Sequence, residues 1–213
     1  MNLPTLAIRN VGRNKVRLFL TVMGVAVGLL TFVMLRTAVV SWDSAKDAAV
    51  KDRLVTRHKV TFVMPLPKRY VEDVRNLKGP NGQSLLRAVT YQNWFGGKDP
   101  NNEQDFFATL AVDQSSIFDV YDDILVTPEV KTAFQQKWNA AIVGDLLMEK
   151  KGWKIGQQVT LESPIFGPRV NGEPWTFEIV GPYTATSKAV DKLTFFFRWD
   201  YMNDGASPDM QNY

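Results

Sequence analysis

Few residues in this chain have the types and spacing that catalysis requires. His58 is the sole histidine and there is no cysteine, so thiolate chemistry, histidine-rich metal sites and a Ser-His-Asp triad have little material. His58 lies between two basic residues, which favours a surface histidine over a catalytic one. We therefore expect no catalytic residue, no metal site and no cofactor.

Carboxylates are the remaining candidates for a cation site. They occur at Asp122-Asp123 and in the region from Asp99 to Asp105. Neither stretch has the alternating oxygen ligands and the loop glycine of a calcium-binding loop, so each is interpreted as a solvated turn. Lone carboxylates still leave a glycosidase-like acid pair open as an alternative.

The sequence also predicts no nucleotide-hydrolysing site. Such a site needs a G-x-x-x-x-G-K-[ST] loop after a strand, because its backbone N–H groups cradle the phosphates. The only Gly-Lys step is Gly97-Lys98, followed by Asp99 in a turn-like loop. We expect neither nucleotide binding nor ATP hydrolysis by this chain.

Charge is distributed unevenly along the chain. Five of the 25 Lys and Arg lie in residues 1–40, which hold no acid, so the remainder carries 20 basic and 22 acidic residues. The net charge of +3 therefore comes from the first part of the chain. The near-neutral remainder predicts no nucleic-acid partner.

These residues must be positioned by helices and strands that are mixed along the chain without a strict βαβ order, which predicts an α+β fold.

Local signals mark the ends of the predicted elements. Thr127-Pro128-Glu129 is a helix start, and Gly152 is a helix stop. The aromatic run Phe195–Phe197 predicts a buried strand, with a lipid or ligand surface as the alternative. The predicted helices are 70–77, 127–137 and 145–151. The predicted strands are 59–64, 85–95, 105–112, 140–143, 159–162, 176–180 and 193–197, with a hairpin loop over 96–102.

Residues 18–40 form an apolar run that predicts a transmembrane helix, interrupted only by Arg36. At 1.5 Å per residue it rises about 34 Å, enough to cross a hydrocarbon core with some tilt. A signal peptide usually has a shorter apolar core, and a buried helix rarely lacks a polar face over this length. Arg36 lies near the outer end of the predicted span, where its side chain can extend to the lipid headgroups.

Basic residues precede the run and predict the orientation. Arg9, Arg13, Lys15 and Arg17 should hold the first end in the cytoplasm, so that residues after 41 lie outside. Residues 1–17 are expected to form an interfacial amphipathic helix against anionic lipid headgroups.

The rest of the predicted organisation follows from spacing. Gly24 and Gly28 lie four apart, the small-xxx-small spacing that lets membrane helices approach closely. Alanines and a leucine at helical spacing predict a helical stalk over residues 41–58, helical to about Leu54. Residues 59–213 then form a mixed α/β extracytoplasmic core domain.

Two sets of motifs resemble MacB-type and FtsX-type ABC transporter permeases. The first resembles their opening pattern: Leu6-Ala7-Ile8-Arg9-Asn10, Arg13-Asn14-Lys15-Val16-Arg17, Leu20-Thr21 and Gly24-Val25-Ala26-Val27-Gly28. The second is similar to their periplasmic core domain: Ala141-Ile142-Val143-Gly144, Leu146-Leu147, Lys151-Gly152, Lys154-Ile155-Gly156, Val159-Thr160-Leu161 and Phe177-Glu178-Ile179-Val180-Gly181.

The resemblance implies a permease subunit of a bacterial inner membrane that pairs with a separate cytoplasmic ATPase. It also implies a homo- or heterodimer of permeases, with a periplasmic adaptor or substrate protein as a further partner. Such permeases have three more transmembrane helices after the core domain, and the sequence to Tyr213 shows no second apolar span. We therefore expect a fragment or an isolated front half. The rival hypothesis is a complete single-pass protein whose outer domain binds a ligand or partner.

Overall fold

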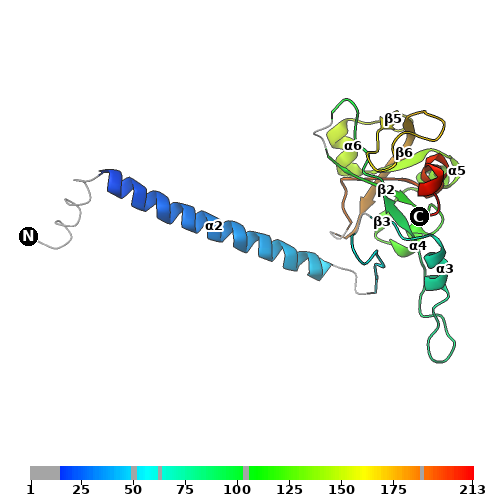
Figure 1. The fold of residues 1–213 in the computed structure, drawn as a ribbon, viewed down its shortest axis with the longest axis horizontal. Coiled ribbons are helices and arrows are strands. Elements are labelled where there is room, and N and C mark those ends of the chain that lie inside the picture. Colours follow the sequence, from blue (N-terminus) through cyan, green and yellow to red (C-terminus); the bar gives the residue numbers. More distant parts are fainter. Residues whose placement is uncertain (1–14, 49–51, 62–63, 103–105, 188–189) are drawn as a thin grey trace, which may run out of the picture. The chain divides into compact units, whose positions relative to one another are not determined.

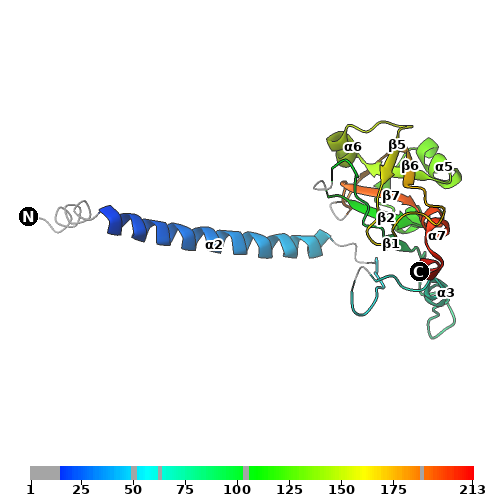
Figure 2. The same cartoon turned by 45° about the horizontal axis from the view of Figure 1, so that its top comes forward.

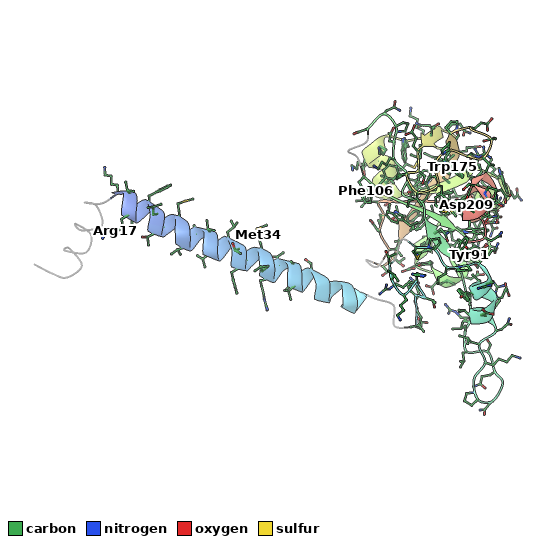
Figure 3. All side chains as sticks on the ribbon, in the orientation of Figure 1. Arg17, Met34, Tyr91, Phe106, Trp175 and Asp209 are labelled. Atoms are coloured by element: carbon green, nitrogen blue, oxygen red, sulfur yellow. The ribbon has the colours of Figure 1, made fainter. Side chains whose placement is uncertain are left out.

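One helix, α2 (Lys15–Ala48), runs for 34 residues. The structure is a computed structural model, and it describes residues 15–48, 52–61, 64–102, 106–187 and 190–213. Side chains project from α2 on every side (Figure 3), and its most apolar stretch has no buried residue. From Lys15 to Ser41 the helix is long and apolar enough to cross a membrane. It contains the whole predicted span over residues 18–40.

Two predictions about the ends of this helix are limited by the described residues. The predicted interfacial helix over 1–17 falls mostly on residues 1–14, which lie outside them. The predicted stalk over 41–58 is helical through Ala48, but Asp52 lies in a turn and residues 53–58 are not helical. The stalk prediction is therefore wrong over residues 52–58, including its helical limit at Leu54.

The reason lies in the residues that follow α2. Val55 and Thr56 are β-branched and lose side-chain freedom in a helix. The Arg53 side chain is held by Asp122 and Asp123, which lie in another segment of the chain.

The chain divides into two units, Met1–Val50 and Lys51–Tyr213. The second unit, called the sheet domain below, begins before the predicted boundary at residue 59.

The sheet domain is built around one mixed sheet (Figures 1 and 2). Among the described residues the strand order is β1-β2-β7-β4-β6-β3, and β5 also pairs with β6. Pairs β2/β7 and β4/β6 are parallel and the other pairs are antiparallel. The strands are β1 (Gln92–Trp94), β2 (Ala108–Val112), β3 (Ile124–Leu125), β4 (Ala140–Gly144), β5 (Gln158–Leu161), β6 (Trp175–Ala185) and β7 (Thr194–Arg198).

Short helices cover both faces of this sheet. They are α3 (Arg69–Arg75), α4 (Ile117–Val120), α5 (Pro128–Gln136), α6 (Asp145–Lys151), α7 (Trp199–Gly205) and the 3-10 helix η1 (Pro208–Met210). Leu147 of α6 and Met202 of α7 pack in one hydrophobic core, whereas Ile117 of α4 and Phe134 of α5 pack in the other. The mixed helix and sheet composition confirms the predicted α+β class.

The central strand β7 shows how the sequence specifies two cores. Successive side chains of a strand point to opposite faces. Phe195 and Phe197 accordingly enter the core with α6 and α7, whereas Phe196 enters the core with α4 and α5. All five residues of β7 are buried, which confirms the prediction of a buried aromatic strand.

The local helix signals are also confirmed. The Thr127 hydroxyl accepts a hydrogen bond from the Val130 N–H, and Pro128 opens α5. Gly152 ends α6 in the left-handed conformation, at φ 63°. These capping patterns depend on a few neighbouring residues, so the sequence alone identifies them.

Two strand predictions need correction. Residues 59–61 and Met64 are not in a strand, and residues 62 and 63 lie outside the described part. The His58 Nδ1 atom accepts the Val60 N–H at 3.2 Å, which favours a local turn over a sheet ladder. In the predicted strand 85–95, only Gln92–Trp94 pairs in the sheet.

Candidate functional site

The segment between α2 and α3 is unusually basic. From Arg53 to Val71 the sequence holds Arg53, Arg57, Lys59, Lys68 and Arg69 and no acid. Its described residues 53–61 and 64–68 are called the junction below, because they connect the long helix to the body of the sheet domain. The cations of this segment must find anions or aromatic rings elsewhere in the chain, or remain in solvent.

Arg53 fastens the first end of the junction to the turn between α4 and β3. Its Nη2 donates to Asp123 Oδ1 at 3.0 Å and to Asp122 Oδ1 at 3.2 Å, and its Nη1 lies 3.4 Å from Asp123 Oδ2. The Arg53 side chain is 13% exposed and that of Asp123 only 8%. A bidentate pair that is largely withdrawn from water fixes both the position and the direction of the guanidinium.

An aromatic ring completes this attachment. The Arg53 guanidinium lies over the Tyr121 ring, 4.5 Å from its centroid. Burial raises the pKa of Tyr121 above 10.0, with Arg53 acting in the opposite direction and Asp123 adding to the rise. The tyrosine is therefore neutral at physiological pH and presents a packed ring face to the cation.

Lys68 fastens the second end of the junction. The backbone N–H of Lys68 donates to the Asn212 carbonyl at 2.8 Å. Its Nζ lies 4.0 Å from the Trp199 ring centroid and 5.1 Å from that of Tyr91. These two rings meet edge to face at 5.2 Å, and Figure 3 marks Tyr91 within the sheet domain. The lysine thus holds the junction against the residue before β1, the start of α7 and Asn212.

The residues before Tyr213 lie beside the junction. The Tyr213 carbonyl accepts hydrogen bonds from Asn93 Nδ2 at 2.7 Å and Trp199 Nε1 at 3.2 Å. An open groove of about 550 Å³ separates the junction from η1. It is lined by His58, Lys59, Met64, Pro65, Leu66, Pro67, Tyr70, Asp209, Met210 and Tyr213.

The contacts of the junction are those of an attachment to the sheet domain. The described residues contain no group of three or more His, Asp or Glu side chains that could hold a metal ion. His58 Nδ1 is engaged by a backbone N–H of its own turn. The junction is attached to the sheet domain at two points 15 residues apart, Arg53 and Lys68.

The sequence-predicted membrane residues fall on two parts of the chain. Lys15 and Arg17 lie at the first turn of α2 and are exposed, whereas Arg9 and Arg13 lie outside the described residues. Gly24 and Gly28 lie one helical turn apart, and nothing in the described chain comes within 4 Å of a Cβ placed at either. That open face leaves room for a second helix.

The acidic stretches behave differently from the prediction of solvated turns. Asp123 is buried and paired with Arg53, so that interpretation is wrong for this residue, although Asp122 is exposed. Asp99 lies 3.4 Å from Lys151 Nζ. Sequence reasoning missed both attachments of the junction, that of Arg53 to Asp123 and that of Lys68 to Trp199. The acid-free run after residue 52 was the signal that could have indicated distant acidic partners.

Comparison with known proteins adds no family to this description. No protein-family profile matches the chain. No curated protein matches it significantly.

Proposed function

We propose that α2 anchors this protein in a membrane, with its Lys15 end in the cytoplasm and the sheet domain outside. The supporting observations are a span of sufficient length and apolarity and the basic residues that precede it.

Within that arrangement, the function proposed is that of a MacB- or FtsX-type permease subunit. Its task is to pass ATP-driven motion from the membrane to the sheet domain, for export, lipoprotein release or envelope regulation in a bacterial inner membrane. In this proposal a separate cytoplasmic ATPase hydrolyses ATP. A second permease subunit packs against the side of α2 that carries Gly24 and Gly28. The motifs quoted above support this proposal.

One structural observation carries the proposal: the chain that leaves α2 is bound to the sheet domain almost at once. Arg53 lies five residues after Ala48 and forms a largely buried ion pair with Asp123. A long flexible linker would absorb movement of the helix. An attachment this close to the helix instead allows movement to reach α4 and β3.

Replacing the Arg53 guanidinium tests the mechanical role. In the complete transporter, Arg53→Gln should reduce transport at least tenfold while the ATPase continues to turn over. The matched control is Arg75→Gln, since Arg75 forms an exposed ion pair with Glu72 and should leave transport unchanged. Transport at the normal rate by the Arg53 variant would contradict coupling through the junction.

The rival proposal is a single-pass protein whose sheet domain binds a ligand or partner without a transporter. Reading the genomic DNA past codon 213 separates the two. Three further apolar spans and a neighbouring ATPase gene support the permease. A stop codon with no ATPase gene nearby supports the single-pass protein.

A further inference from the structure

The apolar side chains most exposed in the sheet domain are concentrated in one short stretch. Among its described residues, Leu54 is 86%, Val60 77% and Val55 70% exposed, above every other large hydrophobic residue of the domain. All three lie within the seven residues 54–60, whereas the other exposed apolar residues are scattered along the chain. Single exposed apolar residues are ordinary, but a concentrated group indicates a binding surface.

The same stretch carries positive charge. Arg57 and Lys59 are exposed, and the nearest acid in the sequence on either side is Asp52 or Glu72. Apolar and cationic side chains that occur together on one exposed segment match the boundary between lipid headgroups and acyl chains, where both kinds of group are satisfied. A protein partner with a purely apolar surface would offer no charge complementary to these exposed cations.

Chain length places this stretch within reach of the membrane that α2 enters. Ala48 lies seven residues beyond Ser41, a helical rise of about 10 Å. The six residues from Ala48 to Leu54 can extend about 20 Å, so the chain can return to the membrane surface. Arg53, next to the first residue of the stretch, is held against the sheet domain by Asp123.

We propose that residues 54–60 form a membrane-binding loop that inserts Leu54, Val55 and Val60 among the lipids and binds anionic headgroups through Arg57 and Lys59. This inference rests on the proposed membrane anchoring and is independent of the permease mechanism. The loop would hold one side of the sheet domain on the membrane surface. Its lipid partner is an anionic phospholipid of the same bilayer.

The absence of natural cysteine makes the test direct. Single variants Leu54→Cys, Val60→Cys and Val170→Cys of the full chain are labelled with an environment-sensitive fluorophore. Val170 is the control, since it is also exposed, at 57%, and lies far along the chain. Phe32→Cys reports on α2 itself. Each protein is placed in nanodiscs of phosphatidylcholine, with or without phosphatidylglycerol and a spin-labelled lipid quencher.

Labels at positions 54 and 60 should shift their emission to the blue and be quenched by the spin-labelled lipid, whereas the label at 170 should not. Adding Arg57→Gln or Lys59→Gln should lower the ratio of inserted to free loop about fivefold for each cation removed. Omitting phosphatidylglycerol should act in the same direction.

Three outcomes separate the possible failures. Emission at 54 and 60 identical to that at 170, with position 32 quenched, would overturn the loop proposal alone. A blue shift without quenching that grows with protein concentration would assign the loop to a second copy of the chain, and would also overturn it. An unquenched label at position 32 would mean that the anchoring proposal itself has failed.

Discussion

The two units of this chain treat apolar side chains in opposite ways. In α2, Phe32 is 66% exposed, and apolar residues cover the whole circumference of the helix. In the sheet domain, Phe177 is fully buried and contacts a cluster of other rings. The sheet domain packs aromatic residues such as Phe177 into its own core, whereas α2 requires a surrounding phase or partner that the described chain does not supply. The same residue type therefore has a different role in each unit.

The largest expected effect comes from one substitution made in both units. Phe177→Ala should lower the free energy of unfolding of the sheet domain by about 3–5 kcal/mol, since it leaves a cavity among packed rings. Phe32→Ala should leave that free energy unchanged. Urea unfolding of the membrane-reconstituted protein, followed by tryptophan fluorescence, measures both. Equal costs for the two variants would mean that α2 and the sheet domain unfold as one unit.

A second pair of variants examines the place where the sheet domain holds the junction. Asp123→Asn should lower the free energy of unfolding by about 3 kcal/mol, because it removes the buried one of the two carboxylates that pair with the largely buried Arg53 guanidinium. Asp122→Asn should lower the free energy of unfolding by less than about 1 kcal/mol, since the Asp122 side chain is 66% exposed. Hydrogen exchange over residues 52–60 should accelerate only in the first variant. Similar exchange in both would show that Asp123 does not fix the junction.

Alanine substitution at two glycines, one in each unit, should change the free energy of unfolding by a smaller amount. A Cβ at Gly144 would lie 2.0 Å from the Lys192 carbonyl oxygen, whereas one at Gly24 meets nothing within 4 Å. Gly144→Ala should therefore destabilise the sheet domain by about 1–3 kcal/mol. Gly24→Ala should be neutral or strengthen α2, since alanine is the better helix former. Both are measured by the same unfolding experiment. A neutral Gly144 variant would refute the tight contact between β4 and the chain at Lys192.

The smallest expected effect is the pH dependence at the junction. Burial raises the pKa of Tyr121 above its ordinary value of 10.0, so the folded state favours the neutral phenol. Its contribution to stability is fully present below pH 10 and is lost as the pH rises through the folded-state pKa. Tyr121→Phe should remove part of the alkaline loss of stability and keep the ring beneath Arg53. An unchanged alkaline unfolding profile would show that Tyr121 ionises freely in the folded protein.

These contrasts also explain what could be predicted from the sequence. The long apolar helix over residues 18–40, the α5 start at Thr127 and the α6 end at Gly152 were correctly predicted, because each depends on adjacent residues. The core strand containing Phe195 was also correct, since a continuous aromatic run has few alternatives to burial. Patterns of this kind involve little information from distant parts of the chain.

The junction could not be predicted in the same way. The pairing of Arg53 with Asp123 joins residues 70 positions apart, and no local pattern specifies that contact. The stalk was predicted to remain helical because its alanines have helical spacing, but the distant ion pair and the β-branched residues at 55 and 56 favoured another conformation. The average charge beyond residue 40 likewise concealed an acid-free basic run.

Cysteine accessibility in intact cells tests the central claim, a membrane-spanning α2 with the sheet domain outside. The variants Val16→Cys and Val170→Cys place a thiol at each side of the span, at side chains that are 69% and 57% exposed. A membrane-impermeant maleimide should label position 170 in intact cells and position 16 only after permeabilisation, with both labels on an uncleaved chain. Labelling of position 16 alone in intact cells, or release of a shorter soluble product, would contradict the account.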